Sequence, residues 1–287
     1  MKNKNNNKIA IGTAQFSNNY GITNEDFLEF KDLENILKDC KEFRINTLDT
    51  APEYEGVEEK LGKFNLKYFD LITKISLEKN KKILDENSLK KNIENSFIKL
   101  NVQKIYAILI RKPTNLLNNK KLLNIILDYK KKKKICKIGY TLYDISELEA
   151  LYSYFRPDIV QIPYSLVDKR FEKRNWINKM YKDGVEIHIR SVFLQGLLLA
   201  NLKNLPKKFD KYKEFFKRFE NWVKKNNISK LQACLFNVLL DKRIKRVIVG
   251  INSRQNLNEI NNVRCKELIY PDWLTLDDDY LIDPSKW

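Results

Sequence analysis

The chain has 287 residues, of which 43% are hydrophobic, and this predicts a sizeable core in one large domain over residues 1–287. No apolar run reaches the roughly 20 residues of a membrane span, and the N-terminus lacks the apolar stretch of a signal peptide, so we expect a cytoplasmic protein with no membrane partner. The four cysteines lie far apart, which predicts reduced thiols and no metal site. The net charge of +17 comes from Lys and Arg spread along the chain without a zinc-finger, helix-turn-helix or RNP signature, which favours a solvated basic surface over nucleic-acid binding.

Short apolar, β-branched runs alternate with longer amphipathic stretches. The runs predict eight strands, over residues 9–13, 46–49, 69–74, 105–110, 136–141, 159–162, 186–191 and 247–250. The stretches between them predict helices over residues 26–43, 87–100, 116–132, 145–155, 168–182 and 229–241. This alternation is typical of a parallel sheet with helical crossovers, and eight strands in a chain of this length favour a closed (β/α)8 TIM barrel. A doubly wound sheet is the alternative, but no G-x-G-x-x-G loop follows the first strand.

Three chemically matched side chains stand at the ends of the second and third predicted strands. Asp49 ends the second strand, Tyr54 follows in the next loop, and Lys74 ends the third strand. Because alternate residues of a strand share a face, Asp49 and Lys74 can both point into a barrel, at the rim where such folds carry their chemistry. A lysine beside a phenol makes its hydroxyl a better acid, and a carboxylate holds the lysine, so this trio suits general acid catalysis. The alternative is an ordinary Asp–Lys ion pair and a surface tyrosine.

The seventh predicted strand has an unusual polar face formed by Glu186, His188 and Arg190. Buried polar groups cost free energy unless they are paired, so we expect this strand to line the site or to hold a buried network. His188 is the only histidine and lies deeper than Arg190, which favours a core or orienting role over a catalytic one. The segment 199–226 follows, with aromatic residues that either close over a substrate or pack as in an ordinary helix: Phe215, Phe216, Phe219 and Trp222.

Taken in order, the motifs of the chain resemble those of the aldo/keto reductase family. They are I-G-T-A-Q-F-S-N-N-Y-G-I-T-N at 11–24, R-I-N-T-L-D-T-A-P-E-Y at 44–54, I-T-K at 72–74, Q-I-P-Y-S-L-V-D-K-R at 161–170, R-S-V-F-L-Q-G-L-L at 190–198 and V-I-V-G-I-N-S-R-Q-N-L-N-E-I at 247–260. The ending D-P-S-K-W resembles that of a bacterial branch associated with sugar modification. The resemblance implies a TIM barrel that binds NADP(H), with NADH possible, and reduces a sugar-derived or anionic carbonyl by hydride transfer.

The resemblance also implies roles for individual residues. Tyr54 would donate a proton to the carbonyl oxygen, while Lys74 and Asp49 would tune its acidity. The residues that it assigns to the cofactor are Thr13 at the first strand, Thr141, Gln161 and Arg190 at the nicotinamide, Ser191 and Leu194 at the pyrophosphate, and Gly250, Ser253, Arg254, Asn256 and Glu259 at the adenosine.

Two positions depart from the family pattern. Arg111 ends the fourth strand where the family has a catalytic histidine. An arginine can donate hydrogen bonds to the same carbonyl oxygen but adds a permanent charge. Arg111 therefore implies either a substrate with a carboxylate or phosphate, or a weakened enzyme that acts as a dinucleotide-binding sensor or accessory protein. At the adenosine end, Gly250 and Asn256 stand where many members have Lys or Arg. We expect a small-molecule carbonyl substrate and a monomer or weak homo-oligomer.

Overall fold

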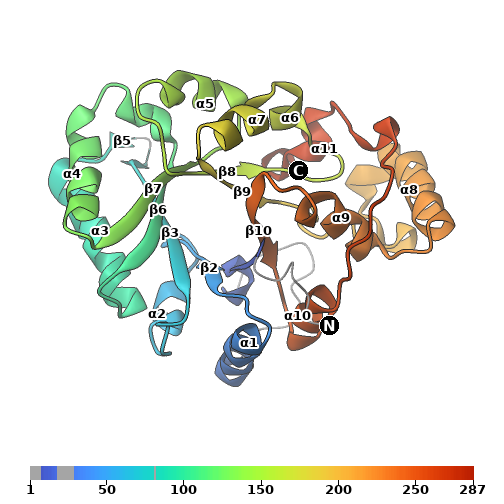
Figure 1. Ribbon diagram of the computed structural model, residues 1–287, viewed down its shortest axis with the longest axis horizontal. Helices are drawn as coiled ribbons and strands as arrows, with labels where there is room; N and C mark the ends of the chain where they lie inside the picture. The colour runs from blue at the N-terminus through green and yellow to red at the C-terminus, as the bar shows by residue number, and fades with distance from the viewer. Residues whose placement is uncertain (1–7, 18–28, 81) are drawn as a thin grey trace.

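The computed structural model describes residues 8–17, 29–80 and 82–287, and within them parallel strands close into a barrel of eight (Figure 1). In chain order the strands are β1 (Ile9–Gly12), β2 (Thr47–Asp49), β3 (Asp70–Ser76), β6 (Ile105–Arg111), β7 (Ile135–Thr141), β8 (Ile159–Pro163), β9 (Glu186–Arg190) and β10 (Ile244–Gly250). Each strand pairs with its neighbour in the chain, and β10 pairs with β1 to close the barrel. The expected (β/α)8 TIM barrel is confirmed.

Helices surround the barrel, most of them between successive strands (Figure 1). They are α1 (Phe30–Glu42), α2 (Val57–Leu61), α3 (Glu86–Leu100), α4 (Lys120–Lys131), α5 (Ile145–Tyr152), α6 (Arg170–Lys173), α7 (Trp176–Lys182), α9 (Lys230–Leu239) and α10 (Arg254–Asn261). Several begin where the local sequence supplies a cap: the side chains of Asp85, Asp144 and Ser229 accept hydrogen bonds from the first turns of α3, α5 and α9. The helices therefore start largely where short-range chemistry dictates.

The helices differ from the prediction in a few places. The stretch 168–182 forms two short helices, α6 and α7, because Asn175 between them has a left-handed backbone with a φ of 59°. A 3₁₀ turn, Pro113–Leu116, comes before α4, so that helix begins later than expected. The short helix α2 and the hairpin of β4 (Glu78–Lys79) and β5 (Lys82–Ile83) were not predicted. Residues 26–28 of the first predicted helix, and residues 18–24 of the first family-like motif, lie outside the described residues.

The barrel interior has an apolar layer and a polar layer. Ile72, Ala107, Leu109 and Ile159 form the apolar cluster, while the outward faces of the strands pack against the helices in the larger core. Below the apolar layer, Glu186 accepts hydrogen bonds from Lys137 Nζ (2.7 Å) and the Tyr106 hydroxyl (3.0 Å).

The expected buried network on β9 is thereby confirmed. His188 is fully buried, and its Nε2 lies 3.3 Å from Glu186 Oε2. Burial by itself raises the pKa of Glu186, but hydrogen bonds from His188 and Lys137 outweigh it and lower that pKa to about 2. Burial lowers the pKa of His188, and Glu186 offsets only part of this effect. A deep position in this network fits the core role expected for His188.

One glycine is required by close packing of two strands. A Cβ atom on Gly139 of β7 would lie 2.2 Å from the carbonyl oxygen of Ile159 in β8. Real atoms do not approach this closely, so any side chain here would push the two strands apart. Two residues further on, these strands carry Thr141 and Gln161, which are themselves paired in register. Gly139 therefore helps to fix the spacing of candidate site residues.

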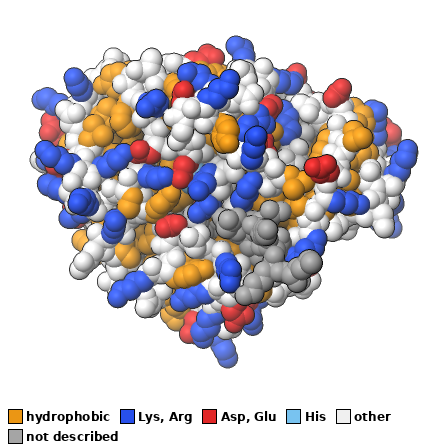
Figure 2. All heavy atoms as spheres, viewed as in Figure 1, with side chains coloured by type: hydrophobic (Ala, Val, Ile, Leu, Met, Phe, Trp, Pro, Cys, Tyr) orange, Lys and Arg blue, Asp and Glu red, His pale blue; other side chains and the backbone are white. Residues whose placement is uncertain are grey.

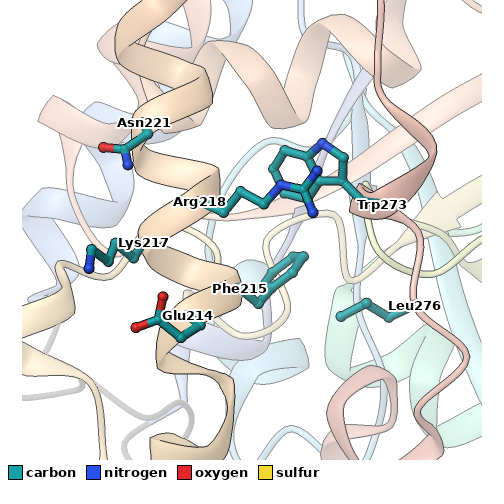
Figure 3. A pocket seen from close by; sticks show the side chains of 7 residues that line it. All are labelled: Glu214, Phe215, Lys217, Arg218, Asn221, Trp273 and Leu276. Carbon is teal, nitrogen blue, oxygen red and sulfur yellow. The ribbon is translucent and has the colours of Figure 1, made fainter.

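The segment after β9 forms α8 (Lys213–Lys225), which lies outside the ring of helices at the right of Figure 1. Phe216 and Phe219 on this helix are buried. Phe215 packs edge-on against Trp273 with ring centroids 6.1 Å apart, and the Arg218 guanidinium lies 4.2 Å from the centre of the same ring. In Figure 3 the side chains of Phe215 and Arg218 point toward Trp273 and Leu276 of the C-terminal segment, and these residues line a cavity of about 530 Å³. The aromatic residues of α8 thus pack as in an ordinary helix.

Basic side chains are dispersed over the visible surface. Figure 2 shows Lys and Arg spread across that face and mixed with Asp and Glu. In the described part of the chain, no helix combines the length and the apolar character needed to cross a membrane.

Candidate active site

The C-terminal ends of the barrel strands open into a cleft of about 700 Å³. All four residues expected to be catalytic line it: Asp49, Tyr54, Lys74 and Arg111. So do most of those expected at a cofactor: Thr141, Gln161, Arg190, Ser191, Gly250, Asn256 and Glu259. The cleft therefore joins the strand ends at the centre of the barrel to the first turns of α10.

A buried ion pair forms the base of the cleft. Lys74 Nζ donates hydrogen bonds to Asp49 Oδ1 (2.5 Å) and to the carbonyl oxygen of Thr50 (2.9 Å). The second oxygen of Asp49 accepts a hydrogen bond from Gln161 Nε2 at 2.7 Å. Burial by itself lowers the pKa of Lys74, but Asp49 and Tyr54 outweigh it, so the pKa of Lys74 lies above its ordinary value. Lys74 thus remains a positively charged ammonium.

Tyr54 lies directly beside this ammonium. Lys74 Nζ is 5.5 Å from the centre of the Tyr54 ring. The backbone places the ring there through a tight turn after β2, in which the Tyr54 N–H donates to the Ala51 carbonyl (3.0 Å) and the Val57 N–H donates to the Tyr54 carbonyl (3.0 Å). The turn leads straight into α2. The three side chains that the sequence singled out therefore meet at one place.

Arg111 stands at the edge of the same group. Its Nη1 lies 3.3 Å from Glu53 Oε1, and both side chains are about one-third exposed. A partly solvated pair of this kind is weak, so Glu53 leaves Arg111 able to bind another acceptor in the cleft.

Two residues expected at a nicotinamide, Thr141 and Gln161, are buried and hydrogen-bonded to each other. The Thr141 hydroxyl donates to Gln161 Oε1 at 3.1 Å. Thr13 does not line the cleft, because its hydroxyl donates to the carbonyl oxygen of Asp49 at 3.1 Å from a fully buried position. Leu194 is also buried and does not line the cleft, although its φ of 46° belongs to a turn that exposes Ser191, whose φ is 62°. Thr13 and Leu194 are therefore buried behind the residues that line the cleft.

The α10 end of the cleft is polar without being basic. Ser253 caps α10 by accepting a hydrogen bond from the Asn256 N–H (3.2 Å), and Asn256 Oδ1 accepts one from the Asn252 N–H (3.2 Å). Neither Ser253 nor Arg254 lines the cleft. Arg254 instead makes a bidentate ion pair with Asp39 of α1, at 2.7 and 2.8 Å. Of the residues expected at the adenosine, Ser253 and Arg254 therefore lie outside the lining of the cleft.

Comparison with protein families agrees with this geometry. Residues 8–277 match the model of the aldo/keto reductase family. The chain belongs to the aldo/keto reductase family. A comparison with curated proteins finds no match.

Solved aldo-keto reductases share the fold of this family member. AKR11C1 from Bacillus halodurans, in its holo form, is 18% identical over 91% of this chain and 88% of that chain, with a TM-score of 0.73. The glycerol dehydrogenase AKR11B4 from Gluconobacter oxydans is 20% identical over 91% of this chain and 88% of that chain, with a TM-score of 0.70. At these identities the likeness supports the fold, and the family match identifies an oxidoreductase.

Two further residues of this aldo/keto reductase face the cleft and were not predicted. Arg170 donates through Nε to the buried Asp168 (2.9 Å) and through Nη1 to the carbonyl oxygen of Tyr143 (3.1 Å). The ring of Tyr143 lies 4.2 Å under the guanidinium of Arg190, whose Nη2 donates to the Leu142 carbonyl at 3.0 Å. The sequence held a signal for Arg170, which ends the family-like motif at 161–170, but none for Tyr143.

Proposed function

We propose that this aldo/keto reductase reduces carbonyl compounds with NAD(P)H and that Tyr54 is its proton donor. The observation that carries the proposal is the meeting of Tyr54, Lys74 and Asp49 at the base of one cleft. General acid catalysis needs a proton donor, which here is a phenol. The ammonium beside it stabilises the phenolate that forms, and the carboxylate holds the ammonium in place.

Each of the four side chains has a different role in the proposed reaction. Tyr54 donates its hydroxyl proton to the carbonyl oxygen, and the neighbouring Lys74 stabilises the phenolate that remains. Asp49 keeps Lys74 charged and in place through their buried hydrogen bond. Arg111 donates to the same oxygen or to a second group of the substrate. A bound reduced nicotinamide supplies the hydride to the carbonyl carbon.

The residues around the cleft fit such a cofactor. Thr141 and Gln161 present hydroxyl and amide groups at the nicotinamide end. The loop after β9 has positive φ angles at Ser191, Leu194 and Gly196. Left-handed turns of this kind form concave backbone surfaces that bind anions, which suits a pyrophosphate. Gly250 lies at the end of β10 with the Gln15 side chain against it, and a Cβ atom there would lie 2.1 Å from Gln15 Nε2.

Replacing Tyr54 by Phe tests the role of the hydroxyl. We expect turnover of aldehydes to fall by about 10²-fold or more, because the proton donor is lost, while binding of the reduced cofactor, followed by its fluorescence, stays within twofold or so. Tyr143→Phe is the matched control, since Tyr143 lines the same cleft but stacks on Arg190. Equal turnover in wild type and Tyr54→Phe would remove the proposed role. Cofactor binding without oxidation by any carbonyl would instead identify the dinucleotide-binding sensor.

We further propose that the substrate is an anionic, sugar-derived carbonyl. Three guanidinium groups line the cleft, from Arg111, Arg170 and Arg190. A carboxylate or phosphate on the substrate would make charge-assisted hydrogen bonds with one or two of them. The sugar-derived class rests on the resemblance alone.

Arg111→His tests the anionic preference. We expect kcat/KM for aldehydes with a carboxylate or phosphate to fall about tenfold, as one charge-assisted hydrogen bond is lost, and turnover of neutral aldehydes to rise. Lys112→Gln is the control, because it removes a neighbouring charge that pairs with Glu78 and does not line the cleft. A wild type that prefers neutral aldehydes would contradict the assignment.

A further inference from the structure

The distribution of charge along the cleft bears on which dinucleotide it accepts. This inference rests on the proposed function, which puts the nicotinamide beside Tyr54. The same cleft continues from Tyr54 to the first turns of α10, where Asn252, Asn256 and Glu259 line it. An extended dinucleotide that starts at Tyr54 therefore brings its adenosine ribose to this end.

The cations that line the cleft all lie at the other end. Within the described residues they are Lys74, Arg111, Arg170 and Arg190. Arg190 is the last residue of β9, which pairs with β10. Its guanidinium points away from β10 and donates to the carbonyl oxygen of Leu142, which follows β7. The adenosine end is thus lined by neutral amides and one carboxylate, Glu259. A ribose 2′-phosphate would meet a negative charge there.

Arg254 is the cation nearest to this end along the chain, and it is already bound. Its Nε and Nη2 hold both oxygens of Asp39 at 2.7 and 2.8 Å. Asp39 is buried, whereas the Arg254 side chain is about half exposed. Within the described part of the chain, Arg254 is the only hydrogen-bond partner of the Asp39 carboxylate. If Arg254 turned toward a phosphate, it would leave a buried carboxylate unpaired, which is costly.

We propose that this aldo/keto reductase prefers NAD(H) to NADP(H), and that Asp39 sets the preference by holding Arg254. Carboxylates accept hydrogen bonds from the ribose 2′-hydroxyl of NAD, whereas a 2′-phosphate needs a free arginine or a similar cation. Glu259 supplies such a carboxylate to the lining of the cleft, and Asn256 supplies an uncharged amide. This preference is the opposite of the one that the family resemblance favours.

Binding of NADH and of NADPH to the full chain, measured by calorimetry or nicotinamide fluorescence, tests the proposal without turnover. We expect wild type to bind NADH about tenfold more tightly, as one missing charge-assisted contact implies. Asp39→Asn frees Arg254 and raises NADPH affinity about tenfold, with NADH affinity within twofold or so. Glu42→Gln is the matched control, because it removes one charge from the same helix and makes no hydrogen bond to Arg254.

Asn256→Arg gives a second route that does not disturb Asp39. It adds a guanidinium to the lining of the cleft, and we expect the same rise in NADPH affinity. Tighter binding of NADPH by wild type would overturn the proposal, and so would NADPH affinities that both Asp39→Asn and Asn256→Arg leave unchanged. If wild type bound neither dinucleotide, the proposed function itself would fail.

Discussion

Replacing Asp49 by Asn removes the charge that keeps Lys74 buried as an ammonium. The two side chains are 5% and 6% exposed, and the second Asp49 oxygen accepts from Gln161. Loss of one partner of a buried ion pair costs about 3–5 kcal/mol. In the variant the new amide also places a donor opposite the Gln161 amide or against Lys74. We therefore expect the free energy of unfolding, measured by urea denaturation at neutral pH, to fall by about 3–5 kcal/mol.

The same substitution changes how stability depends on pH. In wild type the folded state keeps the Lys74 proton longer than the unfolded state, so the contribution of Lys74 is complete below the ordinary pKa of 10.5 and is lost as pH rises through the higher folded value. In Asp49→Asn, burial remains and the opposing carboxylate is gone, so the pKa of Lys74 falls below 10.5. The unfolded state then binds more protons between the two values, and stability rises with pH across that window.

The double variant Asp49→Asn/Lys74→Met separates charge from packing. With both charges removed, no ion is left unpaired in the interior, and we expect at least half of the lost stability to return. An Asp49→Asn variant within about 1 kcal/mol of wild type would refute the reasoning, because surface pairs have effects of that size. A double variant less stable than the single one would also refute it.

Two other substitutions probe the barrel below the site. Burial lowers the pKa of His188, so the unfolded state takes up a proton first as pH falls below 6.5, and wild type loses stability there. The His188→Gln variant should lose less stability over the same pH range, with stability measured as the midpoint of urea denaturation. Parallel pH profiles of the two proteins would contradict this. Gly139→Ala should destabilise the chain by about 1–3 kcal/mol, since its Cβ would meet the Ile159 carbonyl oxygen at 2.2 Å. An unchanged melting temperature would mean that β7 and β8 separate without cost.

The strands and the central trio could be predicted because they follow from short-range rules. Alternation along β2 and β3 puts Asp49 and Lys74 on inward faces, and the parallel arrangement brings both strand ends to one rim. The polar face of β9 likewise indicated a buried network before its partners were known. Those partners, Lys137 and Tyr106, come from other strands and became evident only when the barrel closed.

The sequence alone determined the alternation of strands and helices, the family and the residues at the strand ends, because period, capping and motif spacing are local properties. Only the tertiary structure decided which distant side chains pair. Arg254 lies 215 residues from Asp39 in the chain, and Arg170 reaches the Tyr143 carbonyl from the first residue of α6. Such contacts depend on how helices pack around the closed barrel, and no local pattern records that geometry. The charge at the α10 end of the cleft is therefore a property of the fold.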